Sequence, residues 1–416
     1  MKVVILSTSE KIGGAAIAAN RLMKTLNKSD IDVKMLVRDK QTNDPNVISL
    51  NSSFFKTKIN KIRFFWERFI IFIATGFDRK NLFRASISNT GTDISKHPLI
   101  QNADIIHLHW INQGFLSLKD IKKLIKLNKP IIWTMHDMWP CTGIYHHTKD
   151  SPFYTDTLGK RVLVKRAIRK KGNLYKSGKI SFVCCSHWLE NEAIKSALTN
   201  PYTITCIPNP IDTTIFKRLK QNTRAEFGLP EDKYLMLFGA LNVTDKQKGI
   251  DYLIESLTYL KNNFTTTHNN IELVVFGQVK TEIQSLFNVP IHAMGYLNDT
   301  YQIVKLYNAV DIFITSSLEE NLPNTIMESM ACGTPCIGFN IGGIQEMIDH
   351  KQNGYVAEYL NAQDLAIGIN CLLMHSDKQA LSDSCIKKVK ENYDEFKVAE
   401  QYKKIYNNKY GNKCKK

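Results

Sequence analysis

The stretch of residues 311–347 constrains the fold more tightly than any other part of the chain. It begins with a short apolar run that ends at Thr315, as a buried parallel strand does. A loop with adjacent acidic residues follows, and then a short helical pattern for which Asn324 is the expected N-cap and Gly333 the expected C-terminal stop. Residues 335–339 form the next apolar run. This order of strand, helix and strand within about 30 residues predicts a βαβ unit, and hence a parallel sheet.

Two acidic residues are spaced around the predicted start of this helix. Glu320 lies in the loop before it, and Glu328 lies one turn inside it, four residues after Asn324. The free N–H groups at a helix start bind phosphate, and flanking carboxylates could hold the hydroxyl groups of a sugar nucleotide. The alternative is that Glu320 only favours the helix dipole and that Glu328 is a surface residue. The spacing alone leaves both interpretations open.

The same alternation of apolar runs and helical patterns extends over all 416 residues, which are too many for one ordinary domain. A proline-rich crossing at 207–212 separates two halves. We therefore predict an α/β protein with two Rossmann-like, doubly wound domains, 1–208 and 209–393, and a C-terminal helix within 394–416 that crosses back to the first domain. The predicted strands are 2–7, 31–37, 103–109, 130–135, 180–185, 234–239, 271–277, 291–294, 311–315, 335–339 and 353–356, and a further strand ends within 203–212, in the proline-rich crossing.

The cysteines and the apolar runs indicate where the protein works. None of the nine cysteines forms a CxxC pair and several lie inside apolar runs, which favours reduced thiols in the cytoplasm over a disulfide frame or a zinc site. We expect no secretory signal, because the N-terminus leads straight into an apolar strand. We also expect no transmembrane helix, because no apolar run reaches the ~20 residues that span a bilayer.

Positive charge is concentrated in the first half of the chain. Residues 1–200 hold 33 Lys and Arg against 15 Asp and Glu, whereas the remainder holds 22 against 24. Part of this excess is interleaved with aromatic and isoleucine side chains in the segment 54–84. Such a basic helix with an aromatic face suits a membrane interface. The alternative is an amphipathic helix that packs on its own domain; RNA binding is disfavoured, because no RNA-binding signature accompanies the charge.

Several polar residues of the first half follow predicted strands. His107, His109, His136 and Asp137 lie where open parallel sheets bind ligands, at the carboxyl ends of strands, and are site candidates. Gly13 and Gly14 follow the first strand; the loop lacks the GxGxxG pattern, so it serves either for close approach of a ligand to the backbone or as a tight packing turn. A metal site is disfavoured, because the spacings form no recognisable ligand set, including those of His107, His146 and His147.

Together these features resemble the GT-B fold, in which two Rossmann-like domains face an interdomain cleft. The motifs resemble family 4 ("group 1") of the retaining glycosyltransferases, whose E-x7-E pattern is matched by Glu320 and Glu328 and whose donor-phosphate lysine is matched by Lys248. Further matches are Ile207-Pro208-Asn209-Pro210-Ile211-Asp212, Gly295-Tyr296-Leu297 and Asn353-Gly354-Tyr355. In the first half, HLHW and WTMHDMWPCTG resemble the branch that contains colanic-acid-type and other exopolysaccharide transferases.

The resemblance implies a role for each matching residue. Glu328 would bind the ribose hydroxyls and Glu320 the donor sugar, with Asn324 beside them. Lys248 would neutralise the departing diphosphate. Gly13 and Gly14 would let the phosphates approach the backbone closely. His136 would contact the reacting sugar, and His109 and Asp137 would lie on the acceptor side.

One position departs from the family pattern. Members often carry an arginine after the strand glycine, as a second phosphate cation, but here Gly239 is followed by Ala240. Lys246 is a candidate to replace that cation, whereas Gln247 would supply only a neutral hydrogen bond.

The implied activity is retaining transfer of a hexose from a nucleotide-diphosphate sugar, with UDP favoured, to a saccharide or lipid-linked saccharide in bacterial surface polysaccharide synthesis. No metal or other cofactor is expected. The expected partners are the donor, the acceptor and the anionic inner face of the membrane, without nucleic acid, so the protein would be cytoplasmic and peripheral. Two alternatives stay open: a nucleotide-sugar epimerase of GT-B-like fold, and a non-catalytic subunit that binds nucleotide sugars.

Overall fold

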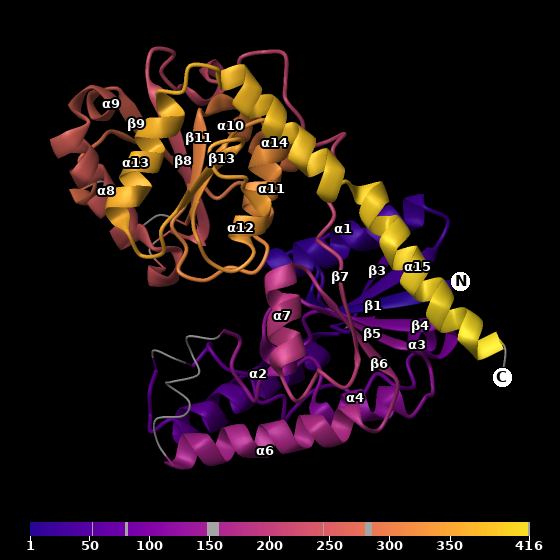
Figure 1. The fold of residues 1–416 in the computed structure, drawn as a ribbon. Coiled ribbons are helices and arrows are strands. Elements are labelled where there is room, and N and C mark those ends of the chain that lie inside the picture. Colours follow the sequence, from indigo (N-terminus) through magenta and orange to yellow (C-terminus); the bar gives the residue numbers. More distant parts are fainter. Residues whose placement is uncertain (52, 80–81, 148–157, 244, 279–284, 415–416) are drawn as a thin grey trace. The chain divides into compact units, whose positions relative to one another are not determined.

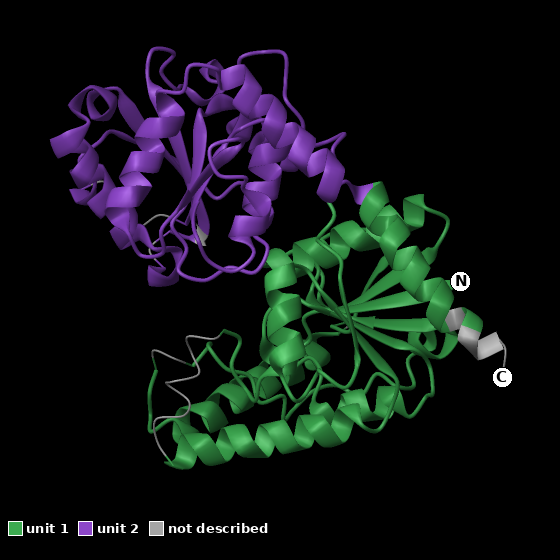
Figure 2. Ribbon diagram, in the orientation of Figure 1, with its two compact units in different colours: residues 1–210, 396–416 green, residues 211–395 purple. Residues whose placement is uncertain are grey.

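The chain divides into two compact units. The computed structural model describes all residues except 52, 80–81, 148–157, 244, 279–284 and 415–416. Unit 1 comprises Met1–Pro210 and Phe396–Lys416, and unit 2 comprises Ile211–Glu395 (Figure 2). These limits lie two residues beyond the boundaries that we placed at 208 and 393. The C-terminal segment belongs to unit 1, although the preceding residues belong to unit 2.

Unit 1 is built on a seven-stranded sheet in the order β3-β2-β1-β4-β5-β6-β7, and its adjacent strands are parallel. Apart from its ends, the sheet is buried on both faces, which explains the continuous apolar runs in the sequence. The strands are β1 Lys2–Ser9, β2 Asp32–Asp39, β3 Val47–Ser49, β4 Ile105–Leu108, β5 Ile131–Met135, β6 Ile180–Cys184 and β7 Thr203–Cys206.

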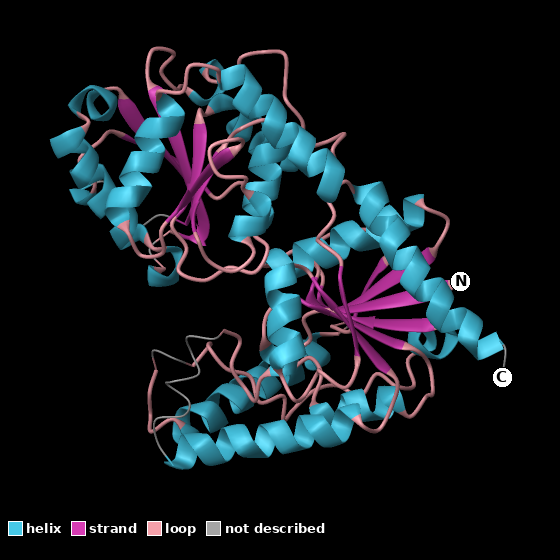
Figure 3. Cartoon of the chain, viewed as in Figure 1, coloured by secondary structure: helices cyan, strands magenta, loops and turns pink. Residues whose placement is uncertain are grey.

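Helices cover both faces of this sheet (Figures 1 and 3). One core packs side chains of α4, α6 and α7 against the sheet around Trp133 and Phe182. The other packs α1 and the C-terminal helix α15, through Tyr402 and Tyr406, on the opposite face. The helical segments are α1 Gly14–Lys28, α2 Phe54–Ala74, α3 Pro98–Asn102, α4 Leu118–Ile125, η1 Trp139–Cys141, α6 Leu158–Tyr175, α7 His187–Lys195 and α15 Glu395–Cys414.

Unit 2 repeats the architecture with a six-stranded parallel sheet in the order β10-β9-β8-β11-β12-β13. Its strands are β8 Tyr234–Asn242, β9 Ile271–Gln278, β10 Ile291–Gly295, β11 Ile312–Thr315, β12 Cys336–Phe339 and β13 Gly354–Ala357. Its helical segments are η2 Ala225–Phe227, η3 Lys246–Lys248, α8 Ile250–Asn263, α9 Thr265–Asn269, α10 Thr300–Ala309, α11 Asn324–Ala331, α12 Ile344–Met347, α13 Ala362–Leu373 and α14 Lys378–Asn392. The predicted pair of doubly wound α/β units is confirmed.

Each sheet has one point at which the strand order reverses, between β1 and β4 in unit 1 and between β8 and β11 in unit 2. Ligands of open α/β sheets bind outside the carboxyl ends of the strands at this point. In unit 1 the loops there carry Gly13 and His109. In unit 2 they carry Lys248 and Glu320. The topology therefore places these predicted site residues at the binding edge of their own sheet.

Candidate active site

The loops that follow β8 and β11 in unit 2 are joined through their backbones. Gly249 has a φ of 67°, and a side chain there would overlap the carbonyl oxygen of Ser316. The hydroxyl of Ser316 donates to the carbonyl of Lys248 at 3.0 Å, and the N–H of Leu318 donates to the carbonyl of Gln247 at 2.8 Å. A glycine is required where two backbones approach so closely with positive φ. This contact holds the end of η3 against the loop that carries Glu320.

A third loop, after β12, supports the other side of Glu320. Gly342 has a φ of 57°, and a side chain there would overlap the carbonyl oxygen of Glu320. The N–H of Gly343 donates to the carbonyl of Asn321 at 2.8 Å. The backbone around Glu320 is therefore held between the loops of the two neighbouring strands.

Lys248 and Glu320 form an ion pair in this assembly. The Nζ of Lys248 lies 2.6 Å from Oε1 of Glu320, although the two residues are 72 positions apart in the sequence. The charge of Glu320 raises the pKa of Lys248 and outweighs the effect of burial, so the lysine is cationic at neutral pH. The side chains are 36% and 19% exposed, which leaves the pair accessible from solvent. The structure thus brings together two of the three residues that we predicted to be catalytic.

Helix α11 begins at Asn324, one residue earlier than a cap at Asn324 would give, and the expected capping role of Asn324 is wrong. Pro323 occupies the N-cap position with extended backbone, and Asn324 is the first helical residue. Proline suits this boundary because it has no N–H to satisfy. The predicted stop is confirmed, because Gly333 follows the helix with a φ of 85°. No acidic residue lies in the first turn, so the positive end of the α11 dipole is not neutralised within its own helix.

Glu328 is buried on α11 and is not a surface residue. Its side chain accepts a hydrogen bond from the hydroxyl of Tyr307 on α10 at 3.2 Å. Burial and the charge of Glu328 raise the pKa of Tyr307 well above its ordinary value, so the phenol keeps its proton and donates. We did not predict Tyr307, since nothing in its local sequence distinguishes it from a core tyrosine.

The remaining cation candidates of unit 2 lie on or near η3. Lys246 is exposed in the same turn as Lys248. The side chain of Asp245 caps this turn by accepting from the N–H of Gln247 at 3.0 Å. Ala240 lies within β8, not after it. The departure from the family pattern at Ala240 therefore lies inside strand β8. The exposed Lys246 is the candidate that would replace the missing cation.

In unit 1, the glycine loop after β1 is exposed. Gly13 is the N-cap of α1 with a φ of 92°, and Gly14 is the first helical residue. A Cβ at Gly13 would meet no atom within 4 Å. Glycine is thus required at this position by backbone conformation and not by crowding.

His109 and His136 are hydrogen-bonded to each other at the ends of β4 and β5. Nδ1 of His109 and Nε2 of His136 lie 2.9 Å apart, and Nδ1 of His136 lies 3.6 Å from Sγ of Cys185. Nε2 of His109 is buried and has no hydrogen-bond partner among the described residues. A buried N–H without an acceptor is rarer than a buried lone pair, so His109 carries its proton on Nδ1 and donates to His136. His136 then carries its own proton on Nδ1.

Burial keeps these imidazoles neutral. It lowers the pKa of His136 to about 4, against a smaller opposing effect of Asp137, and lowers the pKa of His109 well below its ordinary value. His136 can therefore donate a hydrogen bond from Nδ1 at neutral pH but does not supply a positive charge.

The C-terminal helix α15 contacts the buried histidine of β4. His107 is fully buried; its Nδ1 bonds to the hydroxyl of Tyr406 and its Nε2 to the hydroxyl of Thr134, each at 2.7 Å. Thr134 also bonds to the hydroxyl of Tyr402 at 3.0 Å. The rings of His107 and His109 lie 4.4 Å apart. His107 is therefore a core residue that anchors α15, and not a ligand-binding residue.

Asp137 is held within unit 1 by several donors. Its carboxylate accepts from Nε1 of Trp110 at 2.8 Å, from the N–H of Trp139 at 2.9 Å and from Nδ1 of His146 at 2.7 Å. Burial alone would raise its pKa, but the charge and hydrogen bond of His146 and the Trp139 N–H lower it overall. Asp137 therefore stabilises the loop that follows β5. An acceptor-side role for it stays a prediction.

Helix α2 exposes most of its large apolar side chains to solvent and buries several polar ones. The buried residues include Asn60, Glu67 and Arg68. Glu67 accepts from the N–H groups of Ile87 and Ser88 at 2.8 Å. The large exposed apolar residues of the segment are Phe54, Phe55, Ile62, Phe65, Trp66, Phe69, Ile73, Phe77 and Phe83. Residues 80–81 of the predicted basic-aromatic segment lie outside the described part. No described helix is long and apolar enough to cross a bilayer.

The fold and this arrangement of residues define a GT-B glycosyltransferase. Comparison of the sequence with known families agrees: residues 12–215 match the family described as Glycosyltransferase Family 4, and residues 220–392 match Glycosyl transferases group 1. The chain belongs to the group 1 glycosyltransferases.

Individual relatives are distant. The chain is 24% identical over 312 residues to the N-acetyl-alpha-D-glucosaminyl L-malate synthase of Bacillus anthracis, which is 74% of this chain and 75% of the relative. It is 26% identical over 233 residues to the UDP-Gal:alpha-D-GlcNAc-diphosphoundecaprenol alpha-1,3-galactosyltransferase of Escherichia coli, which is 53% of this chain and 59% of the relative. The crystal structure of Anabaena HepE in complex with UDP-glucose superposes with a TM-score of 0.66 at 14% identity, covering 97% of this chain and 99% of that one.

Proposed function

We propose that this glycosyltransferase acts with retention, taking a hexose from a UDP-sugar and passing it to a saccharide or lipid-linked saccharide in surface polysaccharide synthesis. The observation that carries the proposal is the Lys248–Glu320 pair, held by three loops beside the start of α11. A cation, a carboxylate and a helix N-terminus at one sheet edge are the groups that a nucleotide-diphosphate sugar requires.

The chemistry of the leaving group suggests a role for each candidate site residue of unit 2. When the bond between the anomeric carbon and the diphosphate breaks, negative charge builds on the phosphate oxygen. We assign its stabilisation to Lys248 and the N–H groups of α11, since one such group contributes about 10²–10³-fold to a rate. Glu320 then exchanges its bond to Lys248 for a hydroxyl of the sugar. Glu328, oriented by Tyr307, binds the ribose hydroxyls.

Retention follows if the acceptor attacks from the face that the diphosphate leaves. The acceptor oxygen forms the new bond to the anomeric carbon, and its proton passes to the departing phosphate oxygen. No separate general base is then needed, and these residues act without a metal ion. His136 contributes a neutral hydrogen bond to the sugar by exchanging its weak contact with the Cys185 thiol.

Relatives support the choice of donor and acceptor. The name of the E. coli relative specifies UDP-galactose as donor and a diphosphoundecaprenol-linked sugar as acceptor, and HepE was crystallised with UDP-glucose. UDP-sugars and polyprenyl-diphosphate saccharides are therefore the first substrates to test.

The test is a thermal-shift screen of UDP-, GDP- and ADP-sugars, followed by product analysis by NMR. We expect a UDP-sugar to raise the melting temperature and the product to keep the anomeric configuration of the donor, with equal rates in EDTA. An inverted product would refute retention, and loss of transfer in EDTA would refute metal-independent transfer. Incubation with donor alone separates the alternatives: an epimerase changes the sugar, and a non-catalytic subunit leaves it intact even with acceptor.

We also propose that α2 binds the anionic inner face of the membrane. Its exposed aromatic residues are accompanied by exposed lysines, whereas Asn60, Glu67 and Arg68 are buried against the protein. This reversed polarity favours an apolar environment outside the protein. Each Lys or Arg near an anionic surface adds about 1 kcal/mol, so several together give salt-sensitive attachment.

Vesicle sedimentation tests this attachment. Wild-type protein should bind phosphatidylglycerol vesicles at low salt, and the Phe65→Ser/Trp66→Ser variant should bind at least about tenfold more weakly, because two large apolar side chains are lost. Ile367→Ser, at a 41% exposed position on α13, is the matched control and should bind as the wild type does. Equal binding by the three proteins, or none by the wild type, would refute the role of α2.

A further inference from the structure

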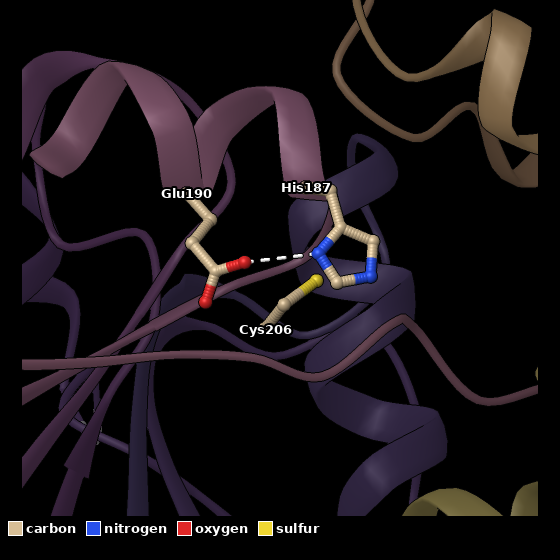
Figure 4. Close-up of side chains that lie close together, drawn as sticks. All are labelled: His187, Glu190 and Cys206. Atoms are coloured by element: carbon tan, nitrogen blue, oxygen red, sulfur yellow. Dashed lines mark hydrogen bonds and ion pairs between the residues drawn. The ribbon is translucent and has the colours of Figure 1, made fainter.

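Three residues of unit 1 with metal-binding side chains lie close together. His187, Glu190 and Cys206 each offer one ligand atom, and these atoms all lie within 4.8 Å of one another. Nδ1 of His187 lies 2.9 Å from Oε2 of Glu190. Figure 4 shows the sulfur of Cys206 directed from the strand toward the imidazole, with Glu190 on the same turn of helix. Among the described residues, this is the one cluster of three or more such side chains.

The secondary structure explains why these residues meet. Strand β6 ends at Cys184, and Ser186 caps α7 by accepting from the N–H of Leu189 at 3.1 Å. His187 and Glu190 are therefore three positions apart in the first turn and project from the same side. Strand β7 pairs with β6 so that Cys206 lies opposite Cys184. The thiol of Cys206 thus stands at the carboxyl end of the sheet, beside the start of the helix.

The accessibility of these groups differs from that of the buried thiols. The side chain of His187 is 73% exposed and that of Glu190 is 22% exposed, and Cys206 is half-buried. Cys141, Cys184 and Cys185 are buried. A thiol at the protein surface can be reached by a hydrated ion, whereas those in the core cannot.

We propose that His187, Glu190 and Cys206 form a zinc-binding site. One nitrogen, one oxygen and one sulfur ligand fit Zn²⁺, whose bonds to such atoms are about 2.0–2.3 Å, with water as the fourth ligand. The thiol loses its proton on binding, so the thiolate and the carboxylate balance the charge of the ion. Mg²⁺ and Ca²⁺ prefer oxygen ligands only and are disfavoured here.

The bound ion would join the start of α7 to the end of β7. Cys206 immediately precedes the proline-rich crossing at 207–212, so zinc would stiffen the chain where it leaves the unit 1 sheet. The site does not include Lys248, Glu320 or Glu328, which belong to unit 2. This inference is therefore independent of the proposed transfer reaction, and removal of zinc should leave that chemistry possible.

Zinc competition against a chromophoric chelator tests the site on full-length, reduced protein without a histidine tag. The variants are His187→Ala, Glu190→Gln and Cys206→Ser, and the matched control is Cys371→Ser, another half-buried cysteine but in unit 2. Co²⁺ serves as a second probe, because a thiolate ligand produces a charge-transfer band in the near ultraviolet. Thermal unfolding of each metal-free variant checks that it folds.

We expect one zinc per chain with a Kd below about 1 µM, a thiolate–cobalt band, and a loss of at least about 100-fold in affinity for Cys206→Ser and His187→Ala. Glu190→Gln should weaken binding less, because an amide oxygen can still coordinate. Cys371→Ser should bind as the wild type does. Wild-type protein without stoichiometric zinc, a missing cobalt band, or equal affinity in the Cys206→Ser variant would overturn the proposal.

Discussion

Replacing Lys248 with methionine removes the charge of the Lys248–Glu320 pair while keeping most of the side-chain volume. The structure separates its effect on folding from its effect on turnover. The pair has a distance of 2.6 Å but side-chain exposures of 36% and 19%, so its contribution to stability is that of an accessible ion pair, about 0.2–1 kcal/mol. In a unit of this size the melting temperature should fall by only a few degrees, about 2–4 °C per kcal/mol.

The loss of turnover should be much larger. If Lys248 stabilises the charge on the departing diphosphate, its removal costs about 2.7–4 kcal/mol in the transition state, or about 10²–10³ in kcat. Glu320→Gln, which keeps the shape of the side chain, should also reduce kcat, because the carboxylate no longer accepts strongly from a sugar hydroxyl.

A double-mutant cycle distinguishes substrate contacts from a mere salt bridge. Initial rates are measured for the wild type, the two single variants and the double variant with the UDP-sugar found in the screen. If the residues contact different parts of the donor, the two losses in activation free energy add; if each only supports the other, the double variant equals a single one. Lys261→Met, at an exposed position on α8, controls for loss of a lysine. Turnover by Lys248→Met within about threefold of the control would refute the assigned role, since that is under 1 kcal/mol.

Three other changes test parts of the structure that support the site. Tyr406→Phe should lower the free energy of unfolding in urea by about 1–3 kcal/mol, because Nδ1 of buried His107 loses its partner. The free energy of unfolding should also fall as the pH drops from 6.5 toward 5, because His136 binds a proton in the unfolded state but not in the folded state, where its pKa is lowered to about 4. This histidine then costs up to about 1.4 kcal/mol of stability per pH unit. The pH profile of His136→Asn should therefore be shallower. Gly249→Ala should destabilise unit 2 and abolish transfer, whereas Gly228→Ala, with similar positive φ but open space around it, should cost only about 1–2 kcal/mol and remain active.

The strands were predictable because burial on both faces leaves a continuous apolar run. The predicted strand 335–339 agrees with β12 to within a residue, and 311–315 agrees equally well with β11. The three-residue strand β3 was not predicted, since three residues carry too little pattern to distinguish it from a loop. Helix ends were less certain for a similar reason. Asn324 is a preferred capping residue, yet the cap fell on the proline before it.

The sequence singles out the residues of the candidate site but does not predict the contacts among them. Motif resemblance singled out Lys248 and Glu320, whereas their meeting depends on backbone contacts at Gly249 and Gly342 that no local pattern encodes. Asp137 illustrates the opposite case. Its place after a strand favoured a ligand contact, but Trp110 and His146 also donate to its carboxylate from positions further away in the chain, and only the fold shows these contacts.

Helix α2 shows most clearly what periodicity leaves undecided. A helical pattern of aromatic and polar residues defines two faces but not which one the protein covers. Here Glu67 is buried because the N–H groups of Ile87 and Ser88 need an acceptor, and its ion pair with Arg68 at 3.2 Å helps to offset the cost of burying both charges. Those bonds fix the rotation of the helix and leave Phe65 and Trp66 outside. The polar contacts therefore determine the membrane-facing surface that we propose, and Glu67→Gln should weaken vesicle binding without changing any exposed apolar residue.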